Sequence, residues 1–508
     1  MSIERRRFLS LAALPALALR GGAQRRKPVF KTNPFTLGVA SGDPTPDGFV
    51  LWTRLAPEPL RGGGLDGDEV DVRWEVAADA SFRRIVRSGV AVADSRLAHS
   101  VHVEIKGLQP DRWYWYRFFA GDDGSGAGRA RTMPAPGVVP PHLSLAFASC
   151  QHFETGYYTA YEHMAAEHPD LVFHLGDYIY EGRANPRVRA HQGGELRSLG
   201  DYRDRYALYR TDPDLQAAHA ACPWIVTWDD HEVDNNYAAE VSEEPDVGRA
   251  SFLERRASAY QAYYEHMPLR AAQVPRGASM RLYREGAFGR LARFSVLDTR
   301  QHRSDQPCGD RTKPPCGGMS APAATLLGRE QREWLFDGLQ ASDAVWNVIP
   351  QQVMMARVDR APGPDVTYSM DQWAGYDVAR RRLLQFLHER RVRNPVVLTG
   401  DIHSNWVNDL PLDFDDPDSP LAATEFVGTS ISSGGDGGPN TEYAAGVMRD
   451  NPFVKLHNAQ RGYVRCDLTP QLFTARYRVL ESVTRRGAER ETLAEFVVED
   501  GRAGAQPA

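Results

Sequence analysis

Short apolar runs that end in clusters of polar side chains organise the second part of the chain. Residues 171–175, 225–228 and 396–399 are mostly apolar, and each run is followed within a few residues by acidic residues and histidine. Runs of this length, bounded by glycine, proline or aspartate, predict buried strands. Ligands commonly bind at the carboxyl ends of such strands. We therefore expect the loops that follow these strands to form one site.

The polar residues after these runs are of the types that bind metal ions. They are Asp177 and Tyr180 after the first run, Asp229, Asp230, His231 and Glu232 after the second, and Asp401 and His403 after the third. A fourth apolar run begins at residue 143 and ends in Cys150. Carboxylates that lie this close repel one another unless a cation sits among them. The pattern predicts a multinuclear metal site that mixes soft and hard donors.

Between and after these strands the pattern changes to that of helices. Helices are predicted within residues 157–170, 198–222, 252–268, 328–342 and 377–391, and three strands after residue 460. This alternation favours an α/β domain with a β-sandwich core flanked by helices. The glycine-rich residues 430–439 match no nucleotide-binding motif and predict a flexible loop at the mouth of the site. Residues 501–508 predict a frayed tail.

The first part of the chain has a different pattern. From about residue 27 to residue 133, short segments of alternating or aromatic character are separated by Gly, Pro and Asp turns. They predict a seven-stranded, all-β, fibronectin-III-like sandwich. The proline-rich residues 134–141 predict a domain boundary. The expected domains are residues 27–135 for the N-terminal sandwich and 142–500 for the α/β domain.

The N-terminus carries an export signal. Residues 5–9 read Arg-Arg-Arg-Phe-Leu and precede a short apolar region, which indicates a twin-arginine signal over residues 1–26. Cleavage is expected near Ala18 or Ala23. The partner would be the twin-arginine (Tat) export machinery, which carries folded proteins, and the location periplasmic or extracellular. No later stretch of the 508 residues is apolar enough to predict a transmembrane anchor.

The net charge bears on possible partners, and the cysteine positions bear on disulfides and metal ligands. A net charge of -6 gives no basic surface that would make nucleic acid a regulatory partner. In an oxidising compartment, Cys308 and Cys316 flank a Pro/Gly-rich loop and predict a local disulfide. Cys150 is the candidate ligand, and Cys222 and Cys466 are expected to be buried. A monomer is expected.

The motifs together resemble one known family. FASCQ, HLGDYIYEG, TWDDHEVDNNY, LDTRQHRSDQP, LTGDIHSNW and HNAQRGYVRC are similar to the motifs of the PhoD-type alkaline phosphatase/phosphodiesterase family. That family belongs to the calcineurin-like metallophosphoesterases and is similar to purple acid phosphatases. Residues 149–151 (Ser-Cys-Gln) and 229–231 (Asp-Asp-His) depart from the wider superfamily, which has Asp-x-His and Gly-Asn-His there, and match the PhoD pattern.

The resemblance implies a ligand set and a mechanism. It implies ferric iron (Fe3+) bound by Cys150, Asp177, Tyr180 and His403, and calcium (Ca2+) bound by Asp177, Asp230, Asn236 and Asp401. Cations activate water for in-line attack on the phosphate ester. His231 is expected to act as general acid, Arg300 to clamp the phosphate, and Asp229 and Glu232 to orient the ligands. The alternative roles are a further metal ligand or a strand-end hydrogen bond for His231, and a surface ion pair for Arg300.

The expected function is hydrolysis of phosphate mono- and diesters by a secreted, metal-dependent alkaline phosphatase/phosphodiesterase. Teichoic acids, phospholipid head groups and extracellular nucleotides are all compatible substrates. One alternative is a di-metal nuclease or nucleotidase, which should carry the Asp-x-His that is replaced here by Ser149, Cys150 and Gln151. The other is a non-catalytic surface-binding protein with a structural metal.

Overall fold

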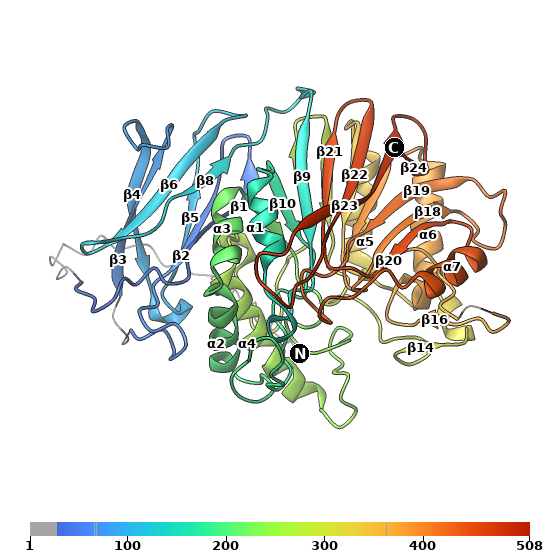
Figure 1. Cartoon of the computed structure of the whole chain (residues 1–508), viewed down its shortest axis with the longest axis horizontal. Helices are drawn as coiled ribbons and strands as arrows, with labels where there is room; N and C mark the ends of the chain where they lie inside the picture. Colours follow the sequence, from blue (N-terminus) through green and yellow to red (C-terminus); the bar gives the residue numbers. More distant parts are fainter. Residues whose placement is uncertain (1–27, 66, 68, 362) are drawn as a thin grey trace, which may run out of the picture.

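The chain folds around two large sheets that face each other. A computed structural model describes residues 28–65, 67, 69–361 and 363–508, so the predicted export signal lies outside the described residues. The first sheet has ten strands in the order β24 (Gln506–Pro507), β23 (Arg490–Glu499), β22 (Leu472–Leu480), β21 (Gly462–Leu468), β9 (Leu143–Ala148), β10 (Leu171–His174), β11 (Trp224–Val226), β1 (Val39–Thr45), β2 (Gly48–Arg54) and β5 (Ser100–Ile105). Figure 1 shows this order across the molecule.

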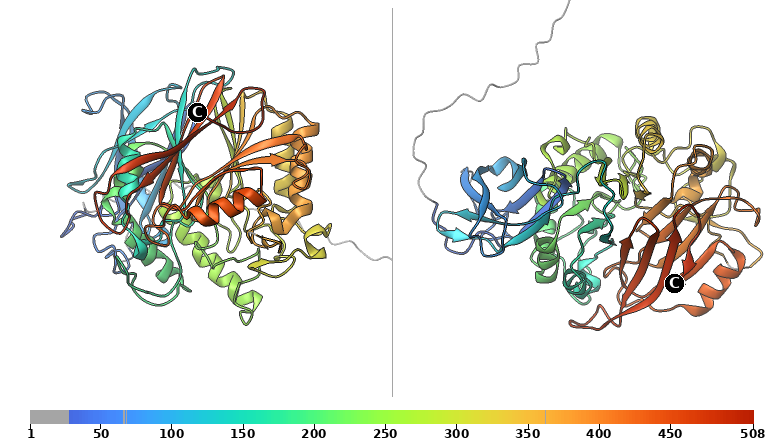
Figure 2. Two further views of the ribbon diagram at one scale, coloured as in Figure 1. Left: turned by 45° about the vertical axis from the view of Figure 1, so that its right-hand side comes forward. Right: turned by 90° about the horizontal axis from the view of Figure 1, so that it is seen from above.

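The second sheet has seven strands. Their order is β12 (Arg284–Phe288), β13 (Ala292–Val296), β15 (Trp346–Pro350), β17 (Pro395–Thr399), β19 (Leu421–Val427), β18 (Asn405–Pro411) and β20 (Val454–Asn458). Apolar side chains from both sheets form one buried core, in which the rings of Phe173 and Phe294 pack with centroids 5.0 Å apart. The turned views in Figure 2 show the two sheets packed together. The predicted sandwich core is present.

Helices cover the outer faces of both sheets. On the first sheet lie α1 (Thr159–Ala166), α2 (Leu199–Arg210), α3 (Pro213–Ala221) and α4 (Arg249–His266), whose apolar residues share a core with β10 and β11. On the second lie α5 (Gly328–Gln340), α6 (Asp377–Glu389) and α7 (Thr441–Asp450). The predicted single helix over 198–222 is two helices, because Asp212 caps a new helix that has Pro213 in its first turn. Within the described ranges, no helix is both long and apolar enough to cross a membrane.

The N-terminal strands are joined to the ten-stranded sheet. A five-stranded sheet of β4 (Ile85–Ala93), β3 (Val70–Ala77), β6 (Trp113–Ala120), β7 (Asp123–Gly124) and β8 (Gly128–Arg131) packs on β1, β2 and β5. Strand β1, which the sequence pattern did not predict, pairs in parallel with β11 at Gly42 and Trp224. The N-terminal β region is therefore a sandwich in which one sheet is the end of the ten-stranded sheet.

Two predicted mobile segments are ordered parts of the fold. In the glycine-rich loop, Ser430 to Ser433 are buried, and the Asp436 carboxylate accepts hydrogen bonds from the backbone N–H groups of Val483 and Thr484 at 2.7 and 2.9 Å. The prediction of a flexible loop is therefore wrong. The predicted frayed tail ends in β24, which pairs with β23, and Ala505 is fully buried. Both predictions failed because they rested on local composition, whereas the order comes from distant partners.

Candidate metal centre

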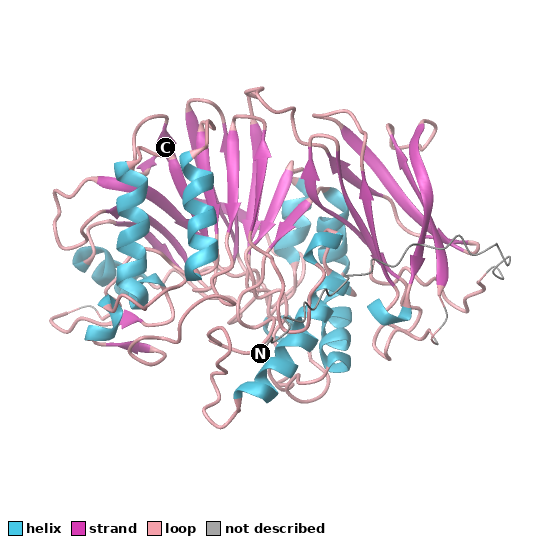
Figure 3. Ribbon diagram, turned by 180° about the vertical axis from the view of Figure 1, so that it is seen from behind, coloured by secondary structure: helices cyan, strands magenta, loops and turns pink. Residues whose placement is uncertain are grey.

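The site lies where the carboxyl ends of strands from both sheets meet. Strands β9, β10 and β11 are parallel neighbours, so the loops after them, which carry Cys150, Asp177 and Asp230, leave the first sheet at one edge. The loops after β13 and β17 of the second sheet bring Arg300 and Asp401 to the same place. In Figure 3 these loops gather below the strands in the middle of the molecule.

One half of the centre, which we call the thiol side, consists of Cys150, Asp177, Tyr180 and His403. Ligand atoms of Cys150, Asp177 and His403 lie within 4.8 Å of one another. The Tyr180 hydroxyl donates to Asp177 Oδ2 at 2.8 Å and lies 3.1 Å from His403 Nε2. It accepts a hydrogen bond of 2.7 Å from Ser433 of the glycine-rich loop. These four predicted residues therefore converge on one point.

The other half, the carboxylate side, consists of Asp229, Asp230, Asn236 and Asp401. Ligand oxygens of Asp229, Asp230 and Asp401 lie within 4.8 Å of one another. Asp177 belongs to both halves, because its carboxylate is also grouped with Asp230 and His231. Asn236 joins this side through its backbone N–H, which donates to Asp230 Oδ2 at 2.7 Å. The predicted ligands thus form two adjoining clusters.

An unusual backbone conformation places many of these ligands. Cys150, Asp177, Asn236, Asp401 and His403 all have φ between +48° and +65°, in the left-handed region. Residues other than glycine rarely adopt it, and such conformations cluster at functional sites. Each strand therefore ends in a sharp turn that directs its loop across the sheet edge toward the other ligands.

Burial and mutual repulsion perturb the acids of the centre. Burial, with a contribution from neighbouring carboxylates, raises the pKa of Asp177 well above its usual range and that of Asp401 to about 6. Burial also raises the pKa of the Cys150 thiol and the Tyr180 phenol. Burial alone would also raise the pKa of Asp230, but the positive charges of Arg300 and His231 outweigh the effect of burial, so the pKa of Asp230 is lowered. The centre holds more negative groups than its own cations balance.

Arg300 is the main cation of the centre, and it does not face the solvent. Its side chain is fully buried and ion-paired with Asp229, with Asp371 at 2.8 Å, and more loosely with Asp230 at 3.5 Å and Asp401 at 3.8 Å. A guanidinium enclosed by four carboxylates would have to leave them to reach a substrate, which argues against the role of phosphate clamp. That role stays a prediction. Arg300 is not a surface ion pair. Arg300 balances charge beneath the carboxylate side.

Glu232 ties two ligand loops together. Its buried carboxylate accepts hydrogen bonds from the backbone N–H groups of Asp177 at 3.0 Å, Tyr178 at 2.5 Å and Asp229 at 2.8 Å. Burial raises its pKa to about 8. Glu232 thus fixes the backbone of the loop that carries Asp177 against that of the loop that carries Asp229. The side chain of Asp229 is itself ion-paired with Arg300.

His231 lies at the opening of the centre with a carboxylate partner. Its side chain is 21 % exposed, its Nδ1 is 2.7 Å from Glu181 Oε2, and its ring lies 4.1 Å from that of Tyr180. Burial would lower the pKa of His231, but Glu181, Asp177 and Asp230 outweigh it and raise the pKa well above the usual value. These carboxylates favour the protonated imidazole.

Several residues of the site were missed by sequence reasoning. They are Glu181 beside His231, Asp371 beside Arg300, Gln372 with Nε2 2.9 Å from Asp401 Oδ2, Asp310 beside Asn236, Ser433 on Tyr180, and Arg461, which donates to the His403 carbonyl. Glu181 directly follows Tyr180 and could have been found from that position. The others follow no predicted ligand strand, so their proximity appears only in the fold.

The residues present fit bound cations. Asp177 Oδ1, Asp229 Oδ2 and Asp230 Oδ1 are buried without a hydrogen-bond partner among the described residues. A buried carboxylate oxygen without a partner is strongly destabilising, and a metal ion supplies the missing partner. The carboxylate side offers oxygen donors, which suit hard cations, and the thiol side adds sulfur and imidazole nitrogen.

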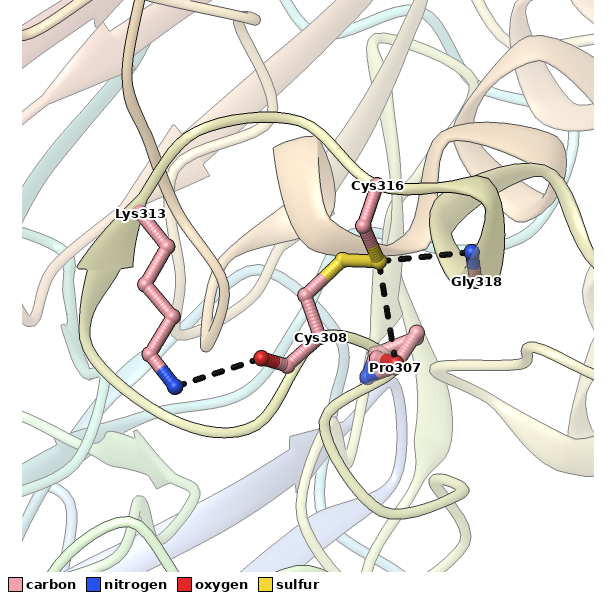
Figure 4. Close-up of a disulfide and its surroundings, with 5 residues drawn as sticks. All are labelled: Pro307, Cys308, Lys313, Cys316 and Gly318. Carbon is pink, nitrogen blue, oxygen red and sulfur yellow. Dashed lines mark hydrogen bonds between the residues drawn. A yellow bond between two sulfur atoms is a disulfide. The ribbon is translucent and has the colours of Figure 1, made fainter.

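Cys308 and Cys316 form a disulfide, whereas Cys222 and Cys466 are free and buried. The disulfide closes a loop that follows β13 and ends before α5. Within it, Lys313 Nζ donates to the Cys308 carbonyl at 3.2 Å, and just after the loop the Gly318 N–H points at the Cys316 sulfur (Figure 4).

Comparison with known proteins gives a consistent result. The PhoD-like phosphatase family matches residues 145–477, and the N-terminal domain of PhoD-like phosphatases matches residues 21–134. Alkaline phosphatase D of Bacillus subtilis (strain 168) is 50% identical over 504 residues, which cover 98% of this chain and 86% of that protein. A solved structure of PhoD superposes with a TM-score of 0.92 at 50% identity, covering 94% of this chain and 93% of that one.

Proposed function

We propose a mechanism for this chain from the premise that it belongs to the PhoD-like phosphatase family and is a phosphoric ester hydrolase of the phosphatase/phosphodiesterase type. The observation that carries the mechanism is the convergence of the thiol side and the carboxylate side on shared Asp177. Among the described residues, unpartnered oxygens of Asp177, Asp229 and Asp230 mark where cations would bind. The non-catalytic alternative is wrong.

Iron and calcium are the cations that we propose. Cys150, Asp177, Tyr180 and His403 would hold ferric iron, because a thiolate, a phenolate and an imidazole join a carboxylate there. Asp177, Asp230, Asn236 and Asp401 would hold calcium through oxygen atoms. When bound, the cations supply charge that neutralises the phosphate oxygens and a lowered pKa for water. The raised pKa values of Cys150 and Tyr180 mean that both must lose a proton on metal binding.

His231 would give the proton to the leaving oxygen. It is partly exposed at the opening, and Glu181 keeps the ring oriented and protonated. When the P–O bond of an alkyl diester breaks, the leaving group is an alkoxide, which needs that proton, whereas a nitrophenyl diester releases a nitrophenolate, which does not. Arg300 and Asp371 would keep the carboxylates in place without contacting substrate. Mono- and diesters, including those of teichoic acids, phospholipid head groups or nucleotides, are the proposed substrates.

The leaving group provides the test of this mechanism. In His231→Gln, hydrolysis of an alkyl diester should fall about 10²–10⁴-fold, and that of a bis-nitrophenyl diester by much less. Glu181→Gln should shift the basic limb of the kcat/KM–pH profile to lower pH. Equal losses on both esters would contradict the acid role of His231. Metal analysis of the purified protein should show iron and calcium, with a visible tyrosinate band that moves in Cys150→Ser.

We also propose that the chain is exported in folded form by the twin-arginine route to the periplasm or outside the cell. Support comes from the Arg-Arg-Arg-Phe-Leu motif at residues 5–9. A change of Arg5 and Arg6 to lysine should retain the protein in the cytoplasm, as fractionation would show.

For the N-terminal β region, we propose residues 27–135 as a fibronectin-III-like unit fused to the 142–500 domain, supported by the shared core of its two facing sheets.

A further inference from the structure

The disulfide-closed loop of residues 308–316 lies against the carboxylate side of the centre. Asp310 in this loop accepts hydrogen bonds from Asn236 Nδ2, at 3.1 Å to Oδ1 and 2.9 Å to Oδ2. The same asparagine donates its backbone N–H to Asp230 Oδ2 at 2.7 Å. Asn236 therefore stands between the predicted cation ligand Asp230 and a carboxylate that nothing else in the mechanism uses.

The contact with Asp310 decides which end of the Asn236 amide is free. An amide offers two N–H donors at one end and a carbonyl oxygen at the other, and the two ends are similar in size. Only the oxygen can bind a cation. Because Asp310 accepts from Nδ2, the amide is held with its nitrogen toward the loop, and Oδ1 remains available. Without Asp310, the NH2 end could turn toward Asp230, whose carboxylate would accept from it.

Several contacts hold Asp310 in its place. The disulfide joins the two ends of its loop, which are 8 residues apart in sequence. Strand β14 (Thr312–Lys313) pairs with β16 (Tyr368–Ser369), and the Met370 N–H donates to the Arg311 carbonyl at 3.0 Å. Just before the loop, Gln306 Nε2 donates to the Asn236 carbonyl and to Asp371 Oδ1, both at 2.8 Å. The loop is thus attached to the centre just before Cys308 and held at its middle by β16.

From these contacts we propose that Asp310 is a positioning residue for cation binding on the carboxylate side. It holds Asn236 Oδ1 toward the cation, and the Cys308–Cys316 bond holds Asp310. The thiol side has no contact with this loop among the described residues, so its metal should be unaffected. The inference rests on the proposed function, since it concerns the cation that Asp230 and Asn236 would bind.

Calcium titration of the full-length protein tests the proposal. Calcium is removed with a chelator and titrated back by calorimetry, while the visible band of the thiol side is recorded. Asp310→Ala should weaken calcium binding about 10–100-fold, as loss of a partner of a metal ligand commonly does. The visible band should stay unchanged. Asp365→Ala, which removes an exposed carboxylate shortly before β16, is the matched control and should bind calcium like the wild type.

A second variant separates orientation from charge. Asp310→Asn removes the charge but keeps an oxygen that can accept from Asn236 Nδ2, so calcium affinity should stay within about threefold of wild type. Affinity as weak as in Asp310→Ala would overturn the positioning role, because the charge alone would then account for the effect. The pair Cys308→Ser and Cys316→Ser should weaken calcium binding severalfold. Unchanged calcium binding in this double variant would show that the disulfide is not needed to hold Asp310.

Failure of this inference differs from failure of the proposed function. If the wild type binds no calcium and hydrolyses no phosphate ester, both are overturned. If the wild type does both and Asp310→Ala binds calcium equally well, only the role of Asp310 is overturned. Loss of the visible band together with calcium in Asp310→Ala would also overturn it, since the effect would then be a general loss of structure.

Discussion

The thiol side and the carboxylate side of the centre are built on different principles. On the thiol side, Tyr180 connects Asp177, His403 and Ser433 by short hydrogen bonds, so its members are largely satisfied by one another. On the carboxylate side, Asp229 and Asp230 keep unpartnered oxygens among the described residues and depend on Arg300 for charge balance. Asp177 Oδ1 of the thiol side also lacks a partner among the described residues, so both sides would hold a cation, but the first is further connected by the Tyr180 hydrogen bonds, whereas the second depends more on charge balance. This difference predicts unequal responses to mutation.

The largest effect should come from the residue that both sides share. Asp177→Ala removes a ligand from each side, so binding of both metals should be lost and hydrolysis should fall at least about 10⁴-fold, or ~5.5 kcal/mol of barrier. Elemental analysis and turnover of a diester measure this. Asp177→Asn, which keeps the shape, serves as the control for folding. Retention of one metal in Asp177→Ala would show that the sides are independent.

Arg300 should matter for stability on the carboxylate side. Arg300→Met leaves Asp229 buried without its counter-ion and leaves Asp371 with Arg303 alone, so the free energy of unfolding should fall by about 3–5 kcal/mol. Urea unfolding measures it, and Arg300→Lys should recover part of the loss. A rise in KM with unchanged stability would instead support the substrate-clamp role that the sequence suggested.

One group on each side, His403 and Asp401, should make the stability of the metal-free protein respond to pH in opposite directions. Burial lowers the pKa of His403 to about 3, so the folded state binds fewer protons than the unfolded state, and its contribution is lost as pH falls below about 6.5. Burial raises the pKa of Asp401 to about 6, so the folded state binds more protons, and stability is lost as pH rises from about 4 to 6.

Bound cations favour the ionised carboxylates and therefore remove the loss of stability that Asp401 causes as pH rises. Metal addition should therefore raise Tm by a few degrees more at pH 8 than at pH 5, as a thermal-shift assay would show. Asp401→Asn should reduce the difference between the two pH values. An equal rise at both would mean that the carboxylate side is not the pH-sensitive half.

The smallest expected effect is on the thiol side. Ser433→Ala removes one hydrogen bond to the Tyr180 hydroxyl, which should cost about 1 kcal/mol of stability and shift the visible band slightly. Both metals should stay bound. A loss of metal in this variant would show that the thiol side is less self-sufficient than its contacts indicate.

Much of the centre could be predicted because strand ends carry local signals. Asp177, Asp230, Asp401 and His403 follow apolar runs, and Cys150 follows another. The convergence of Cys150, Asp177 and Asp230 follows from parallel neighbouring strands, whereas Asp401 and His403 join them through the packing of the second sheet on the first. Arg300 also follows a strand, but its role depends on which carboxylates surround it. Long-range contacts decide that, and no local pattern records them.

The same limit applies to the fold. Helices α1, α4, α5 and α6 follow from their sequence patterns, and the sandwich core of the α/β domain was expected. The pairing of β1 with β11 was not, because residues 42 and 224 are distant in the chain. The order of the glycine-rich loop likewise comes from distant partners of Asp436. Local propensity predicts elements well and their partners poorly.

The strand order of the large sheet also constrains when the protein can fold during synthesis. A ribosome releases β1 early, but its neighbour β11 follows only after residue 224, and β21 must arrive beside β9 from near residue 462. Contacts this far apart in sequence form slowly and late. The sheet can close only when almost the whole polypeptide has left the ribosome. The β1 edge therefore stays unpaired until residue 224 has been made, and the β9 edge until about residue 462.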